Sequence, residues 1–182
     1  MITIAIIVVL LIIPVLIYNS LISKRNNVDN AFASIDAFLK KRYDLIPNLV
    51  NTVKTYMQHE KETLTKITEL RAKALNATPD EQAEIDKQMT GLMKGIMVAV
   101  ENYPELKANE NFIQLQQSLN NIEEQIAAAR RAYNAAVTEF NTSIQVFPNS
   151  IIAGITGFKP RTLFEIPPEE RGNVDVGKLF NQ

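Results

Sequence analysis

Apolar side chains recur at alternating three- and four-residue intervals over three long stretches of the chain. Seven-residue periodicity kept over such lengths is typical of coiled-coil-like helix packing. We therefore predict an all-α fold, with helices over about residues 26–75, 79–103 and 109–147 packed as an antiparallel bundle. The packing positions that we expect to matter most are Phe32, Leu39, Ile46, Pro47, Leu49, Tyr133, Asn134, Phe140 and Asn141.

Local signals set the ends of these helices. Pro47 lies within the first helix and is expected to kink it without ending it, because the apolar pattern keeps its register across the proline. The second helix begins at Thr78–Glu81, where a cap residue, a proline and a glutamate have the spacing of a capping box. Pro104 and Pro148 are expected to end the second and third helices.

The N-terminal stretch is different, because it carries no charged residue before Lys24. About 20 apolar residues span a bilayer as a helix, and residues 1–23 reach that length with a polar end. We predict a retained transmembrane anchor running straight into the first long helix; a cleaved signal segment is the alternative. The anchor residues that we expect to face lipid are Ile2, Ile6, Val9, Ile13 and Ile17.

Charges next to this stretch predict its orientation. Lys24 and Arg25 follow it directly, and no basic residue precedes it. The positive-inside rule then places Met1 outside and the rest of this single-pass protein in the cytoplasm. Membrane lipid is thus a predicted partner.

The predicted helices have unequal lengths, so the second cannot cover the full apolar faces of its neighbours. An apolar stripe left in water favours self-association, and we expect a homo-oligomer. Residues 24–148 would form the bundle, and residues 149–182 an irregular tail. We favour a tail packed along the bundle over one lying on the membrane, and we expect residues 167–182 to be disordered.

Composition narrows the chemistry. The chain has a net charge of −1, one histidine and no cysteine. These values exclude disulfides and thiol chemistry and argue against a nucleic-acid partner. His59 and Glu60 lack the second histidine of a helical zinc site, so we expect a solvated histidine, no metal and no cofactor.

A few polar residues lie close to the predicted packing faces. Asn134 and Asn141 are expected to form hydrogen bonds that fix helix register, with Asn48 and Asn51 as partners; a ligand is the alternative. We expect the basic run at residues 40–42 to be a solvated face, although Arg42 falls on a packing position. For Arg130 or Arg131 we expect an ion pair with Asp44 or a glutamate.

Three segments, in this order and spacing, resemble the bacterial LemA family. They are Arg42–Val50 (RYDLIPNLV), Ala129–Val137 (ARRAYNAAV) running on to Phe140 and Asn141, and Phe147–Ser150 (FPNS) through Gly157–Arg161 (GFKPR). The resemblance implies a long-helix bundle behind an N-terminal anchor in a bacterial cytoplasmic (inner) membrane. It implies no catalytic activity.

Two functions remain in view from the sequence. The first is a non-enzymatic, membrane-anchored helical scaffold that self-assembles and organises or remodels the membrane. The alternative is an adaptor or sensor for a membrane protein partner in protein quality control, such as a membrane metalloprotease, which the resemblance brings in. An enzyme has almost no support, because no residue pattern indicates a cleft that holds paired carboxylates.

Overall fold

A computed structural model describes the backbone of residues 2–164 and the side chains of residues 11–164 apart from 79 and 80. Six α-helices and one short 3₁₀ helix follow one another along this part of the chain. They are α1 (Ile2–Val53), η1 (Gln58–Glu60), α2 (Lys61–Ala74), α3 (Pro79–Val100), α4 (Pro104–Lys107), α5 (Glu110–Gln145) and α6 (Asn149–Thr156). The prediction of an all-α fold is confirmed for the described residues.

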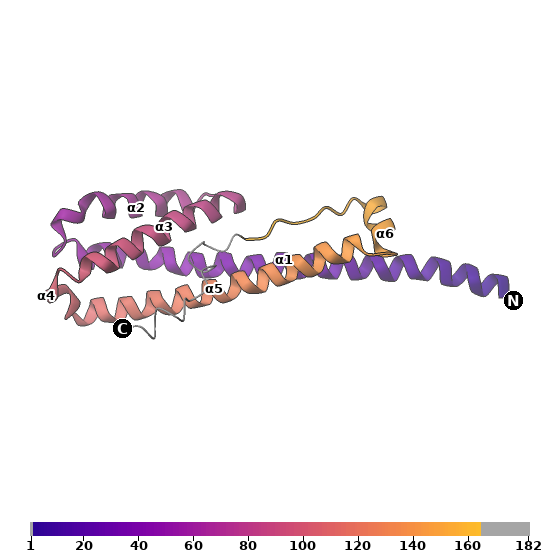
Figure 1. The fold of residues 1–182 in the computed structure, drawn as a ribbon, viewed down its shortest axis with the longest axis horizontal. Coiled ribbons are helices and arrows are strands. Elements are labelled where there is room, and N and C mark those ends of the chain that lie inside the picture. The colour runs from indigo at the N-terminus through magenta and orange to yellow at the C-terminus, as the bar shows by residue number, and fades with distance from the viewer. Residues whose placement is uncertain (1, 165–182) are drawn as a thin grey trace, which may run out of the picture.

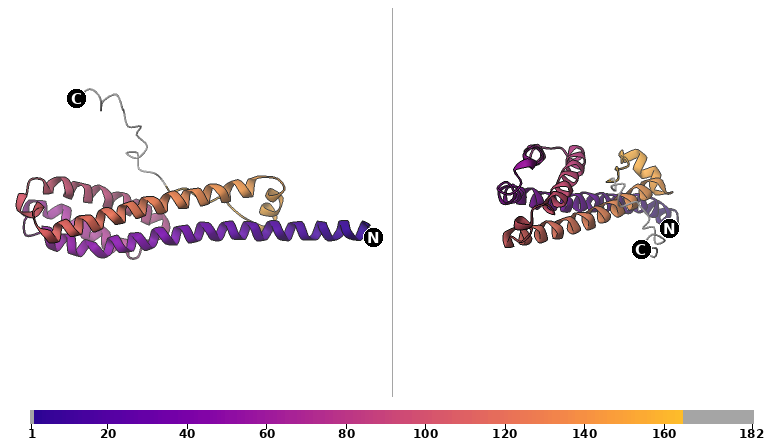
Figure 2. Two further views of the ribbon diagram at one scale, coloured as in Figure 1. Left: turned by 90° about the horizontal axis from the view of Figure 1, so that it is seen from below. Right: turned by 60° about the vertical axis from the view of Figure 1, so that its left-hand side comes forward.

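Two long antiparallel helices, α1 and α5, form the axis of a rod (Figure 1). At 1.5 Å per residue, the 52 residues of α1 extend about 78 Å. The shorter helices α2 and α3 lie over one half of this pair and complete a four-helix bundle. Over the other half lie α6 and an extended segment that runs back toward the bundle, while the start of α1 projects beyond α6 (Figure 2).

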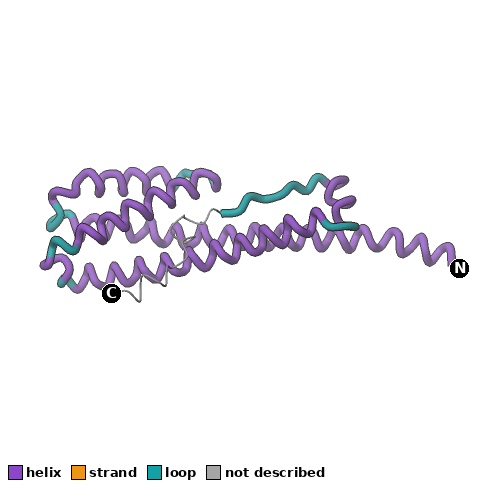
Figure 3. Tube along the Cα trace, viewed as in Figure 1, coloured by secondary structure: helices purple, strands orange, loops and turns teal. Residues whose placement is uncertain are grey.

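The single helix predicted over residues 26–75 is wrong in its middle. Figure 3 shows the chain leaving α1 after Val53 and turning through η1, and α2 then runs back along α1. The turn contains no glycine or proline, but the β-branched Thr52, Val53 and Thr55 precede or occupy it, and such residues are weak helix formers. Both Val53 and Met57 are fully buried, so the apolar pattern continues through the turn without a break.

Helix starts follow the predicted caps. The Glu81 carboxylate accepts the backbone N–H of Thr78 at 2.8 Å, which is half of the capping box. Asn109 caps α5, where its side-chain oxygen accepts the N–H of Phe112 at 3.1 Å. The helix α1 continues through Pro47 to Val53, so this proline does not end it.

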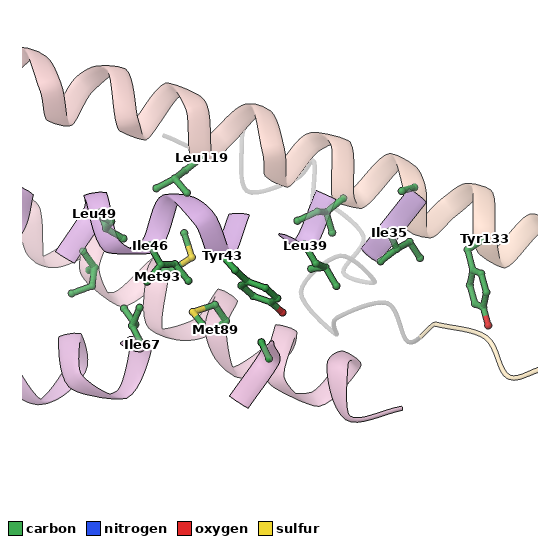
Figure 4. Packing of buried hydrophobic residues seen from close by; sticks show 14 of the residues in the cluster. Ile35, Leu39, Tyr43, Ile46, Leu49, Ile67, Met89, Met93, Leu119 and Tyr133 are labelled. Carbon is green, nitrogen blue, oxygen red and sulfur yellow. The ribbon is translucent and has the colours of Figure 1, made fainter. Parts of the chain in front are cut away.

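The core runs between the helices of the bundle and along the α1–α5 pair. Figure 4 shows Ile35, Leu39, Ile46 and Leu49 of α1 along the interface with the other helices. Met89 and Met93 of α3, Ile67 of α2 and Leu119 of α5 join them, and all eight are buried. Between residues 24 and 53, α1 has no strongly exposed large apolar side chain, so one chain covers this stripe by itself.

The tail differs from the irregular segment predicted after residue 148. It opens with a helix, α6, which ends at Gly157 in the left-handed conformation (φ 74°) that favours glycine. The segment after Gly157 packs along the helix pair, as favoured from the sequence. The predicted disorder at residues 167–182 lies outside the described residues.

Across the described part of the chain, no helix is at once long enough and apolar enough to pass through a membrane. Of the predicted anchor residues, Ile2, Ile6 and Val9 have side chains outside the described set. Ile13 is exposed and Ile17 is half-buried.

Candidate functional site

Inside the four-helix bundle lies a cluster of charged side chains whose central pair is closed to solvent. Arg42 of α1 is 0% exposed and Asp86 of α3 is 1% exposed, and the two form an ion pair. Asp86 also pairs with Arg130 of α5 through its other carboxylate oxygen. The Nη1 atom of Arg42 donates to Oε1 of Glu123 at 2.8 Å and to Oγ1 of Thr90 at 3.1 Å.

The charges in this cluster balance, because two guanidinium groups face two carboxylates. Both oxygens of Asp86 accept from arginine, so neither oxygen is free to face a substrate. A general acid or base needs to reach a reacting group. The cluster therefore joins α1, α3 and α5 inside the bundle through ion pairs, and it is here called the polar lock.

One sequence prediction about these arginines is wrong. Arg42 is not part of a solvated face: Lys40 and Lys41 are exposed, but Arg42 points into the bundle. Arg130 pairs with Asp86, a partner that was not predicted from the sequence. No local signal could have found this pairing, since Asp86 lies 44 residues from each arginine.

Pro47 leaves one backbone carbonyl of α1 without a donor in its own helix, and a side chain of α2 supplies the donor. Proline has no N–H, so the carbonyl of Tyr43, four residues earlier, has no donor within the helix. The Nε of Arg71 donates to this carbonyl at 2.8 Å and so ties α2 to α1. Burial raises the pKa of the Tyr43 hydroxyl, and the neighbouring guanidinium of Arg42 opposes part of that rise.

On the other half of the rod, residues 158–164, here called the strap, run extended along α5. The Asn141 amide makes two bonds with the backbone of Arg161, accepting from its N–H and donating to its carbonyl, both at 2.8 Å. Asn134 makes the same pair with the backbone of Phe164, at 2.8 and 3.0 Å. The Tyr133 hydroxyl donates to the carbonyl of Thr162 at 3.0 Å, and Figure 4 shows its ring directed toward the strap.

Aromatic rings hold both ends of the strap. Phe158 lies 6.1 Å from the ring of Tyr18 and 6.0 Å from that of Phe140. Phe164 lies 6.2 Å from the ring of Tyr133, with the guanidinium of Arg130 over its face at 5.3 Å. The strap thus seals the stretch of the α1–α5 pair that the short helices α2 and α3 do not reach.

These contacts give Asn134 and Asn141 a different partner from the one predicted. Both bind the backbone of the strap, while Asn51 accepts from Lys54, which lies in the turn just after α1. The spacing of seven residues correctly places the two asparagines on one face of α5. The sequence held no signal that this face meets an extended segment.

The other predicted packing residues lie at the helix interfaces. Leu39, Ile46, Leu49, Tyr133 and Phe140 are buried; Phe32 and Pro47 are half-buried, with Phe32 in edge contact with Tyr133 at 5.9 Å. His59 is exposed in η1. Within the described residues, no group of three histidine, aspartate or glutamate side chains is placed to hold a metal ion.

Exposed apolar side chains gather at the opposite end of the rod from the bundle turns. They lie on the first part of α1 and on residues 146–157, here called the α6 elbow. Among the side chains that the structure describes, the exposed large apolar ones belong to these two places apart from Leu75, Val98, Ile113 and Leu163. They are Leu11, Ile12, Ile13, Val15, Leu16, Tyr18, Val146, Phe147, Ile151 and Ile155.

The fold and its two sites define a class of protein: a rod of two long helices, locked by a buried ion cluster at one end and apolar at the other. A model of the LemA family matches residues 31–177, and the chain belongs to the LemA family.

Known relatives agree with this assignment. Protein LemA of Metamycoplasma hominis is 30% identical over 165 residues, which are 90% of this chain and 75% of that protein. Magnetosome protein MamQ 2 of Paramagnetospirillum magneticum is 32% identical over 87 residues, 48% of this chain and 32% of that protein. Magnetosome protein MamQ of Magnetospirillum gryphiswaldense is 29% identical over a stretch of the same coverage.

Proposed function

We propose that this protein is a non-enzymatic helical scaffold anchored in a membrane by the start of α1. The observation that carries the proposal is the exposure of Leu11, Ile12, Ile13, Val15 and Leu16. At 3.6 residues per turn these residues occupy more than half of the circumference of one helical segment, and Pro14 and Ile17 on the remaining side are apolar as well. A helix that is apolar on all sides is typical of a membrane span.

The sequence before this segment supports the same proposal. No charged residue occurs before Lys24, and α1 begins at Ile2, so the apolar part of the helix extends toward the N-terminus. Burying each leucine- or isoleucine-sized side chain in hydrocarbon is worth about 1.5–3 kcal/mol. Lys24 and Arg25 follow the segment and favour a rod that projects into the cytoplasm of a bacterium, with the N-terminus outside.

Self-assembly belongs to the proposal, but its support from the sequence has changed. The unequal helix lengths left apolar faces to cover, and the strap and α6 cover them within one chain. Copies that assemble on a membrane would therefore meet through their anchors, their α6 elbows or the outer surfaces of the rods. Such an array would organise or bend the lipid beneath it.

An adaptor for a membrane protein partner is the second candidate function, and the closed apolar faces favour it. A rod that needs no second copy to bury its core is free to act as a monomer. Its partner would be another membrane protein, for instance a metalloprotease of protein quality control, as the family resemblance suggested.

Mass photometry in mild detergent separates the two candidates. The full chain is compared with one that starts at Ile17, which keeps Tyr18 and Leu21 in place against the strap and α6. A defined assembly of the full chain supports the scaffold. A monomer in both cases favours the adaptor. The anchor itself is tested separately with added liposomes. It is refuted if both chains stay in the aqueous phase to the same extent.

A further inference from the structure

We propose that the α6 elbow is a second membrane-contact surface, which docks on the headgroup region of an anionic bilayer beside the anchor. The inference rests on the anchor of the proposed function and adds to it. The anchor alone would fix where the rod is attached. A second contact would also fix how the rod stands on the membrane.

The shape of α6 supports this docking. Its inner face is formed by Ala153, which is buried, and Ile152, which is half-buried. Ile151 and Ile155, one turn apart, lie together on the outer face and are 53% and 78% exposed. Phe147, just before α6, is 81% exposed. An amphipathic segment of this kind gains free energy by placing its outer face at the boundary of headgroups and acyl chains.

The height of α6 along the rod matches the end of the anchor. Leu21 is fully buried at the level where α6 and the strap meet α1, and the Tyr18 ring contacts Phe158. The apolar part of α1 ends just before these residues, at Ile17. If that part lies in hydrocarbon, the elbow lies at the headgroups, where tyrosine is enriched in membrane proteins.

Charge at this end of the rod selects for anionic lipid. Residues 1–28 and 140–164 contain Lys24, Arg25, Lys159 and Arg161 and no acidic residue. Glu139 and Asp29 pair with Lys24 and Arg161, which leaves a net positive charge at this end. Basic residues close to an anionic surface are attracted to it. A neutral protein partner would gain nothing from this charge.

A single tryptophan reports on the elbow, because the chain contains none of its own. Ile155→Trp places the probe on the outer face of α6, and Val98→Trp, at a site 72% exposed on α3, is the matched control. Ile12→Trp reports on the anchor. Each full-length variant is reconstituted into vesicles of phosphatidylcholine and phosphatidylglycerol, with acyl chains brominated to quench nearby tryptophan.

We expect blue-shifted emission and quenching by brominated lipid for Ile155→Trp and Ile12→Trp, and neither effect for Val98→Trp. Quenching of Ile12→Trp alone would overturn the elbow contact and leave the anchor standing. Quenching of neither would overturn both. If Ile155→Trp is shielded from aqueous acrylamide but not quenched by lipid, a second copy covers the elbow and the inference fails. Equal quenching in vesicles without phosphatidylglycerol would refute the role of charge.

Discussion

Removing the Asp86 carboxylate tests whether the buried cluster locks the bundle. Asp86 is the partner shared by Arg42 and Arg130, and Arg42 is fully enclosed. Asp86→Leu would leave the Arg42 charge with only Glu123 as its counter-ion. Breaking a buried ion pair on one side costs about 3–5 kcal/mol. Asp86→Asn keeps a neutral acceptor and should cost about 1.5–3 kcal/mol.

The sharper test is a double-mutant cycle. Arg42→Met removes the buried cation, and Arg42→Met with Asp86→Leu removes both members of the enclosed pair. The remaining Arg130 and Glu123 are 13% and 36% exposed as side chains and can be partly solvated. The double variant should therefore lose less stability than the sum of the single variants, because apolar replacements of a buried pair are often tolerated.

Urea unfolding of the full chain in mild detergent, followed by circular dichroism, gives each free energy. Asp44→Asn is the control, since Asp44 is the exposed residue that the sequence suggested as an arginine partner. Its free energy of unfolding should change by no more than about 0.5 kcal/mol. Losses for Asp86→Leu below about 1 kcal/mol, or single losses that simply add in the double variant, would refute the lock.

Three further predictions follow from other contacts. Arg71→Met should lower the free energy of unfolding by about 1 kcal/mol, because the Tyr43 carbonyl loses its hydrogen-bond donor. In a Pro47→Ala background the loss should be smaller, because the backbone N–H of Ala at this position can donate to that carbonyl. An unchanged loss there would contradict the role of Arg71 as the replacement donor. Asn134→Leu combined with Asn141→Leu should release the strap from α5. Amide hydrogen exchange should then become faster at residues 158–164, while the four-helix bundle stays protected. Undiminished protection of the strap would contradict the prediction and show that the aromatic contacts alone hold it. Burial raises the pKa of the Tyr43 hydroxyl in the folded protein. Its contribution to stability is therefore full below about pH 10, where the unfolded residue ionises, and is lost as the pH rises through the folded pKa. Tyr43→Phe should reduce this alkaline loss of stability in denaturant titrations, and an unchanged pH profile would refute the prediction.

The helical pattern could be predicted from the sequence because its signals are local. Heptad spacing found the faces of α1, α3 and α5, and the cap at Thr78 found the start of α3. The turn after Val53 escaped because the apolar pattern continues through it and no glycine or proline interrupts it. The run of β-branched residues there was the one available signal.

The sites were harder to predict because their partners are far apart in the chain. Arg42 had an unusual position on a packing face, which could have indicated a buried ion pair, but nothing in the sequence pointed to Asp86. The asparagines of α5 were expected to bind another helix, since buried asparagine commonly does so in coiled coils. Their preference for an extended backbone depends on where α6 redirects the tail.

Arg130 connects the two halves of the rod. Its guanidinium pairs with Asp86 inside the bundle and also covers the ring of Phe164 at the end of the strap. Coupling between two sites is reciprocal. The free energy by which the bound strap stabilises the bundle therefore equals the free energy by which the intact bundle stabilises binding of the strap. Pulling the strap away from α5 would thus also weaken the ion cluster inside the bundle. A single arginine side chain makes the stability of the bundle and the stability of the strap depend on each other.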